Sequence, residues 1–248
     1  MSKAHEYLEP RRPGKVLAHR AFASEGLSLK YPEEGELRSR TVVSRSRAHS
    51  TGKFPSWKMP RMVQWESTNE RAVALLLDAA PEIAKFTEQP LTIYYTLDGE
   101  AFRHYPDFSV EWRSGERELW EVKPAAQAAL PEVIARTRHL QRVLPAVGFE
   151  YRVIIAEDVT TGPELGNALK LLRLGRMPVS SADRERIRRL LLSTSSVSWG
   201  SARRGDLGPL GQCVLARLTL EGDLTFDRAA EIGDTTKFMW AMRRRNRQ

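Results

Sequence analysis

The chain has 248 residues and a formal net charge of +8 at pH 7, so it is long enough to bury a core as one large domain or two smaller ones. The basic balance favours a polyanionic partner: nucleic acid, an acidic protein or a membrane surface. No apolar run approaches the roughly 20 residues of a membrane span, the N-terminus lacks the apolar segment of a secretory signal, and a single cysteine excludes an internal disulfide and a cysteine-based zinc site. We therefore expect a cytoplasmic protein with no membrane partner.

Residues 1–60 are predicted to be a basic N-terminal arm with few regular elements, because Pro and Gly recur and no apolar periodicity is visible. Residues 1–62 hold thirteen Lys and Arg against six Glu and no Asp. Arginines interleaved with hydroxyl side chains suit phosphate contacts, although a flexible, solubilising tail has the same composition. The candidate DNA-binding residues are Arg38, Arg40, Arg45, Arg47, Lys53 and Lys58.

Residues 61–160 carry alternating helix and strand patterns. Ser67-Thr-Asn-Glu70 fits a capping box, and apolar residues at helical spacing follow it up to Pro81. Further elements are predicted as strands at 90–97, 108–112 and 118–123, a helix over 131–144 whose buried stripe excludes Arg136, and a strand at 150–156. A strand reached through a helix is normally parallel to its partner, so we expect an α/β domain with a mixed sheet flanked by helices.

Residues 161–248 are predicted to form a small, mainly helical C-terminal domain. Thr161-Gly-Pro-Glu164 fits a second capping box, and periodic apolar residues follow it up to Gly175. Two more helices are expected over 182–192 and 209–220, separated by a polar loop at 193–208. The turn and strand pattern at 221–226 after these helices suggests a winged-helix-like arrangement.

The stretch His104-Tyr-Pro-Asp-Phe-Ser-Val-Glu-Trp-Arg-Ser-Gly-Glu-Arg-Glu-Leu-Trp-Glu-Val-Lys123 reads as a β-hairpin that turns near Ser114-Gly115. Side chains alternate along a strand, so Glu121 and Lys123 share a face, and Asp107 lies roughly opposite them. Asp107, Glu121 and the backbone carbonyl of Val122 are oxygen ligands of the kind that Mg²⁺ prefers, with water completing the shell. Lys123 would then orient an attacking water or stabilise charge on a phosphate. The competing interpretation is a hairpin with solvated charges.

Glu70 is a fourth candidate with two open interpretations. It lies in the first turn of the helix that precedes the sheet, from which its carboxylate can reach the same strand ends. It is also the last residue of the capping box, where its carboxylate would accept the backbone N–H of Ser67.

Together these residues resemble the PD-(D/E)xK motif of restriction-endonuclease-like nucleases, as "PDF" and "EVK", and the element order resembles the core of that fold. More narrowly, "TGKFPSWKMPRMVQWESTNE", "EQPLTIYYTLDGEAFRHYPDFSVEW" and "LWEVK" are similar to the catalytic domain of TnsA, the endonuclease subunit of heteromeric transposases, over about residues 50–156. TnsA has glutamine where this chain has Glu121. The similarity of the C-terminal region to that of TnsA is weak.

The resemblance implies that Glu70, Asp107, Glu121 and Lys123 are catalytic, with Mg²⁺ as the cofactor and Mn²⁺ as a substitute. It implies cleavage of double-stranded DNA at transposon ends, with a DDE-type transposase subunit and an AAA+ regulatory ATPase as partners, in the bacterial cytoplasm at the nucleoid. Two alternatives remain: a stand-alone restriction or repair nuclease, and a catalytically silent subunit that binds DNA or protein. The intact Asp107, Glu121 and Lys123 argue against the silent subunit.

Overall fold

The computed structural model describes residues 3–10, 26–34, 36, 38–39 and 51–241. The chain divides into two compact units. One, the first unit, comprises Glu6–Asp78 and Glu82–Thr161. The other, the second unit, comprises Met1–His5, Ala79–Pro81 and Gly162–Gln248.

A four-stranded mixed sheet forms the centre of the first unit. Its strand order is β4-β7-β8-β9, in which β4 (Ile83–Glu88), β7 (Phe108–Trp112) and β8 (Arg117–Lys123) are antiparallel neighbours. Strand β9 (Glu150–Ile155) runs parallel to β8, because the chain reaches it through a helix. The sheet is mixed, as the sequence predicts, and it is compatible with a restriction-endonuclease-like core.

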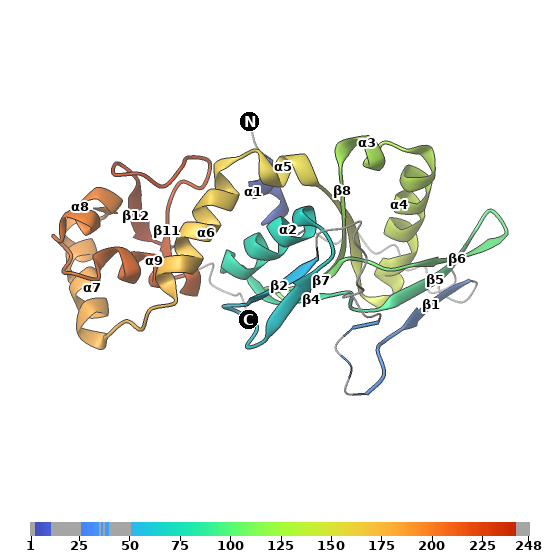
Figure 1. Ribbon diagram of the computed structural model, residues 1–248, viewed down its shortest axis with the longest axis horizontal. Helices are drawn as coiled ribbons and strands as arrows, with labels where there is room; N and C mark the ends of the chain where they lie inside the picture. Colours follow the sequence, from blue (N-terminus) through green and yellow to red (C-terminus); the bar gives the residue numbers. More distant parts are fainter. Residues whose placement is uncertain (1–2, 11–25, 35, 37, 40–50, 242–248) are drawn as a thin grey trace. The chain divides into compact units, whose positions relative to one another are not determined.

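Two longer helices flank the sheet on opposite sides of β8 (Figure 1): α2 (Thr68–Ala79) and α4 (Pro131–Val143). Helix α2 is buried along most of its length, from Ala72 to Ala79. Helix α4 starts with Pro131 at its first position, which costs no hydrogen bond there, and buries Val133 and Leu140. Short helices α3 (Ala125–Ala128), η1 (Leu144–Val147) and α5 (Ala156–Thr160) complete the connections.

The predicted strand at 90–97 belongs to a different sheet, which corrects the expected core. It is β5 (Thr92–Leu97), and it pairs with β1 (Leu27–Lys30) and β6 (Glu100–His104) in an antiparallel sheet of order β1-β5-β6. The core strand in its place is β4, which the sequence reading missed. Gln89 separates β4 from β5 with a left-handed φ of 48°. That conformation ends β4 and turns the chain into the second sheet.

The N-terminal arm has more regular structure than predicted. Besides the short helix α1 (Ala4–Tyr7), its described residues supply β1 to the second sheet and β2 (Gly52–Pro55), which pairs with β3 (Met62–Trp65). These strands form two-stranded or edge pairings, where proline is tolerated because one side of the strand has no partner.

The second unit consists mainly of helices, as expected, and also holds a small antiparallel sheet of order β10-β12-β11. Its elements are α6 (Pro163–Gly175), α7 (Ser181–Thr194), β10 (Val197–Ser198), α8 (Trp199–Arg204), α9 (Gly211–Glu221), β11 (Leu224–Thr225) and β12 (Lys237–Trp240). Helix α8 lies within the predicted loop 193–208, which is a correction. The second capping box is also wrong, because Gly162 caps α6 and Glu164 is buried. The winged-helix arrangement stays a prediction.

None of the helices in the described residues is long and apolar enough to cross a membrane.

Candidate active site

The β7–β8 hairpin places Asp107 beside the end of β8. Phe108 is opposite Trp120, and the Asp107 backbone N–H donates to the Trp120 carbonyl over 2.9 Å. The Asp107 carboxylate turns onto the same strand, where Oδ2 accepts the backbone N–H of Val122 at 2.7 Å. The convergence of Asp107 with residues 121–123 therefore has the form that hairpin symmetry predicts.

Glu121 is the most heavily contacted carboxylate of the site. It is 3% exposed, and Lys123 Nζ lies 3.0 Å from its Oε1. Arg136 Nη2 donates to both of its oxygens at 2.8 Å. The pKa of Glu121 falls to about 2 although burial opposes ionisation, because His104, Lys123, the Tyr151 hydroxyl and Arg136 together favour the charged form. Glu121 is thus a carboxylate at every physiological pH.

The sequence reading missed Arg136, which it placed away from the buried stripe of its helix. Arg136 stands three residues after Val133 on α4, and that spacing brings both onto one side of the helix. Because α4 packs against β9 and covers the sheet, this side meets Glu121. The sequence could have shown only that Arg136 lies within one turn of a buried position of the helix. It could not have shown which strand that side of the helix covers, and therefore not the contact with Glu121.

Tyr151 and His104 form a chain of hydrogen bonds that ends at Glu121. The Tyr151 hydroxyl donates to Glu121 Oε2 at 2.7 Å and lies 2.8 Å from His104 Nε2. A hydroxyl has one proton, so His104 Nε2 must carry the N–H and donate to the Tyr151 oxygen. His104 is 8% exposed, and burial lowers its pKa to about 4 despite the nearby charge of Glu121. The chain His104–Tyr151–Glu121 therefore fixes the carboxylate's orientation with a neutral imidazole.

The buried His104 predicts that the free energy of unfolding falls as the pH drops from about 6.5 to about 4. In this window the unfolded chain binds a proton at residue 104 that the folded chain excludes, so acid favours unfolding. Glutamine at this position keeps an N–H donor for Tyr151 without titrating. Urea titrations between about pH 4 and about pH 7 should therefore show a flatter stability profile for His104→Gln than for wild type. The exposed His5→Gln is the control, and identical profiles for wild type and His104→Gln would contradict this role.

Glu70 satisfies the capping interpretation, with one change from the expected partner. The Ser67 hydroxyl accepts the Glu70 backbone N–H at 3.1 Å and donates to Glu70 Oε1 at 3.0 Å. Glu70 Oε2 accepts the backbone N–H of Glu66 at 2.8 Å, rather than that of Ser67. The same carboxylate also lies near enough to Asp107 to raise its pKa. Glu70 is therefore a helix cap next to the site, and its role as a metal ligand stays a prediction.

The charges around Asp107 fit a divalent cation. Burial, followed by the negative charge of Glu70, raises the pKa of Asp107 to about 7, although the Val122 N–H and Lys123 favour ionisation. A buried carboxylate beside another carboxylate is the imbalance that a bound cation relieves. Among the described residues, no three His, Cys, Asp or Glu side chains form a metal site by themselves. The predicted set therefore depends on Asp107, Glu121, the Val122 carbonyl and water.

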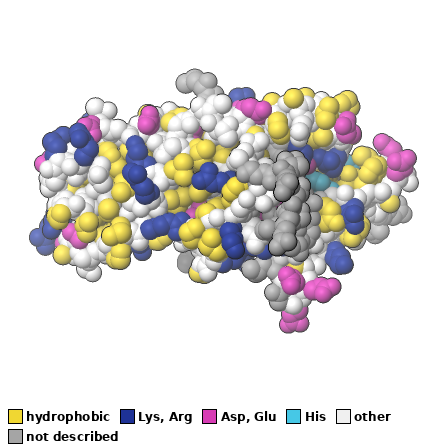
Figure 2. Space-filling view, viewed as in Figure 1, with side chains coloured by type: hydrophobic (Ala, Val, Ile, Leu, Met, Phe, Trp, Pro, Cys, Tyr) yellow, Lys and Arg dark blue, Asp and Glu magenta, His cyan; other side chains and the backbone are white. Residues whose placement is uncertain are grey.

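Of the predicted DNA-binding residues, the three that the structure describes, Arg38, Lys53 and Lys58, make no recorded contact with Asp107, Glu121 or Lys123. Arg38 Nε binds Glu88 Oε1 at 2.9 Å, so its charge is already paired. Lys58 packs near Asp78, and burial lowers its pKa to about 8. Lys53 is exposed on β2. Arg40, Arg45 and Arg47 lie outside the described residues. The face drawn in Figure 2 shows Lys and Arg side chains scattered among other residues rather than in one patch, and DNA contact by all six stays a prediction.

Comparison with known proteins identifies a family for part of the chain. No curated protein matches the chain. Residues 80–155 match the family described as TnsA-like endonuclease N terminal. The matched range contains Asp107, Glu121 and Lys123, together with Arg136, Tyr151 and His104 that surround Glu121. The match at residues 80–155 is consistent with a TnsA-like endonuclease.

Proposed function

We propose that this chain is a Mg²⁺-dependent DNA endonuclease that cuts strands at transposon ends as a subunit of a heteromeric transposase. The observation that carries the proposal is the meeting of Asp107, Glu121 and Lys123 at one end of the β7–β8 hairpin, inside the family-matched range. A solvated hairpin would leave these charges exposed. Instead Glu121 is buried and the Asp107 carboxylate binds the backbone of the neighbouring strand.

The proposed site contains oxygen ligands for a metal ion and positively charged side chains next to them. Asp107, Glu121 and the Val122 carbonyl would hold Mg²⁺, with Mn²⁺ as a substitute, and Glu70 is the additional candidate. When bound, the metal would lower the pKa of a coordinated water and neutralise phosphate charge. Lys123, whose side chain is 29% exposed, lies next to Glu121 and can approach the water or the phosphate. Arg136 and Tyr151 hold the Glu121 carboxylate in one orientation. Metal binding by Glu121 would compete with its contacts to Lys123 and Arg136.

The proposed partners are double-stranded DNA with transposon ends, a DDE-type transposase subunit and an AAA+ regulatory ATPase. The family that residues 80–155 match supports an endonuclease of the transposase type, and it does not identify these particular partners. A restriction or repair nuclease would use the same residues without these partners, so partner dependence separates the two functions.

Metal removal tests the proposed activity. The full chain, mixed with its transposase partner and DNA that carries a transposon end, should yield strand breaks at the end with Mg²⁺ or Mn²⁺ and none with EDTA, because the proposed attacking group is a water that the bound metal activates. Labelled-strand gels measure the products. Cleavage that persists in EDTA would contradict the metal-dependent mechanism. Efficient cleavage of unrelated DNA by the chain alone would indicate a stand-alone nuclease.

The arginines of the arm should determine part of the salt dependence of DNA binding. Each phosphate contact contributes about 0.9 to the slope of log K against log salt on duplex DNA, so replacing Arg40, Arg45 and Arg47 by serine should flatten the slope by up to about 3. Deleting residues 1–48 would be a poorer test, because it also removes β1 and the Arg38–Glu88 ion pair. Fluorescence anisotropy at several salt concentrations measures the slope. Equal slopes for wild type and for the variant with three serines would show that these arginines do not contact phosphates.

A further inference from the structure

The β1-β5-β6 sheet has two chemically different faces. One face carries Leu29, Ile93 and Tyr95, and packs on the core cluster that includes Leu119, Leu140 and Tyr151. The other face carries polar and aromatic side chains, because strand residues alternate. On it Lys30 is opposite Thr92, and Tyr94 is opposite Arg103.

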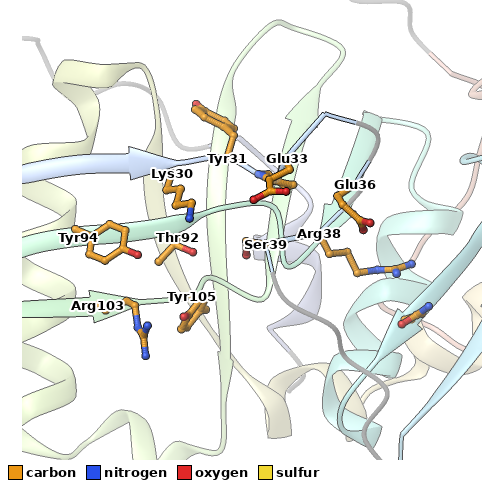
Figure 3. Close-up of a pocket in the computed structure, with 12 residues that line it drawn as sticks. Lys30, Tyr31, Glu33, Glu36, Arg38, Ser39, Thr92, Tyr94, Arg103 and Tyr105 are labelled. Atoms are coloured by element: carbon orange, nitrogen blue, oxygen red, sulfur yellow. The ribbon is translucent and has the colours of Figure 1, made fainter.

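This second face is the floor of a pocket of about 480 Å³ (Figure 3). In the close-up, Lys30 and Tyr94 extend from neighbouring strands toward Thr92, and Tyr105 lies beside them. Ser39, in the segment after β1, also lines the pocket. The volume falls within the range of small-molecule sites.

The side chains that line the pocket include aromatic rings that can stack on the base of a nucleotide and cations that can bind its phosphate. Tyr94 is 39% exposed, so its ring is accessible for stacking. Arg103 lies over the Tyr105 ring, with Cζ 5.4 Å from the ring centroid, which makes a second flat surface. Lys30 and Arg103 can bind a phosphate. Within the described part of the chain neither is held in an ion pair, in contrast to Arg38, which binds Glu88.

Two carboxylates, Glu33 and Glu36, also line the pocket. They weaken its attraction for a free phosphate, but they can accept hydrogen bonds from the exocyclic amino group of a base. Cations, the exposed Tyr94 ring and acceptors together therefore favour a nucleotide over inorganic phosphate. A base inside a duplex presents no free face to stack on, so an unpaired nucleotide fits best.

Backbone contacts connect the pocket to the candidate active site. The Ser39 N–H donates to the Gln89 carbonyl at 2.9 Å, and the Gln89 N–H donates to the Asp107 carbonyl at 2.9 Å. Strand β6 makes a second connection, because its consecutive residues point to opposite faces. Arg103 faces the pocket, whereas His104 faces the core and binds Tyr151 beside Glu121. Asp107 follows Tyr105 by two residues.

We propose that this pocket binds one unpaired nucleotide of the DNA strand that runs through the active site, with its base against Tyr94 and Tyr105 and its phosphate at Lys30 and Arg103. The inference rests on the proposed nuclease function, because the pocket is useful there only if DNA is the substrate. An unpaired nucleotide held next to the cut would fix the position of the scissile phosphate relative to Asp107 and Glu121.

Binding of two labelled single strands by the full chain tests the pocket without any cleavage. One is a mixed-sequence strand of about 16 nucleotides, and the other is an abasic strand of equal length, both measured by fluorescence anisotropy in EDTA. Wild type should bind the base-containing strand more tightly. Tyr94→Ala should lower that affinity by about 5-fold or more and leave the abasic strand unaffected, whereas Tyr94→Phe should retain wild-type affinity. Arg103→Ala should weaken both strands.

Controls separate the pocket from general charge and from the nuclease proposal. Arg138→Ala removes an exposed arginine from α4 and should change binding by less than Arg103→Ala does. Equal affinity of wild type and Tyr94→Ala for the base-containing strand would overturn the proposal, as would an equal loss on both strands. Glu111→Ala, which removes an exposed carboxylate from β7, should bind both strands as wild type does. Loss of binding in Tyr94→Ala combined with intact cleavage in Asp107→Ala would leave the pocket standing and remove the proposed active site.

Discussion

Replacing Asp107 by alanine is expected to abolish DNA cleavage, with a loss of about a thousand-fold or more, while DNA association stays nearly intact. Asp107 is the carboxylate whose pKa is raised to about 7 by burial and by Glu70, so it gains most from a bound cation. Its removal leaves Glu121 as the remaining carboxylate of the predicted ligand pair. Cleavage of end-labelled DNA with Mg²⁺, next to anisotropy with the same DNA, measures both effects.

Two further variants make this test specific. Asp107→Asn keeps an oxygen acceptor for the Val122 N–H and thereby the local backbone structure, but it removes the negative charge. It should be as inactive as Asp107→Ala if the charge is what matters. Glu111→Ala removes an exposed carboxylate from the same strand β7 and should cut normally. Wild-type cleavage by Asp107→Ala or Asp107→Asn would refute the site assignment.

Arg152→Ala is expected to lower the free energy of unfolding by about 3–5 kcal/mol, because it leaves a buried charge without its partner. Arg152 and Glu118 are 3% and 0% exposed, and Arg152 Nη2 donates to Glu118 Oε1 at 3.1 Å. The same guanidinium binds the Tyr7 and Glu9 carbonyls at 3.3 and 3.0 Å. The substitution therefore removes one ion pair of the core and the hydrogen bonds of Arg152 to the N-terminal segment, whereas the contact of the Tyr7 hydroxyl with Asp158 remains.

Urea denaturation of a matched set measures this effect. The double variant Arg152→Met with Glu118→Gln removes both charges, so it should recover part of the stability that Arg152→Ala loses. Trp120 Nε1 donates to Glu118 Oε2 at 2.6 Å, and glutamine keeps that acceptor. Arg138→Ala, at an exposed position, should change the stability by less than about 0.5 kcal/mol. An Arg152→Ala protein as stable as wild type would show that the ion pair contributes nothing.

Much of the candidate site follows from local rules that the sequence contains. Strand alternation places Glu121 and Lys123 on one face, and hairpin symmetry about Ser114-Gly115 brings Asp107 opposite them. The capping box predicts both the start of α2 and the position of Glu70, since it depends on residues only three apart. In each case the interacting residues are close in sequence or related by a single turn.

The sequence alone therefore determined the α/β class, the parallel return through a helix to the last core strand, and the convergence of Asp107, Glu121 and Lys123. Only the tertiary structure decided which strands share a sheet and what contacts the carboxylates. The left-handed Gln89 sends β5 out of the core sheet, and the packing of α4 brings Arg136 onto Glu121. Tyr151, thirty residues after Glu121, reaches it because β9 pairs with β8. Such contacts depend on the packing of separate elements, which short-range patterns of charge and hydrophobicity do not encode.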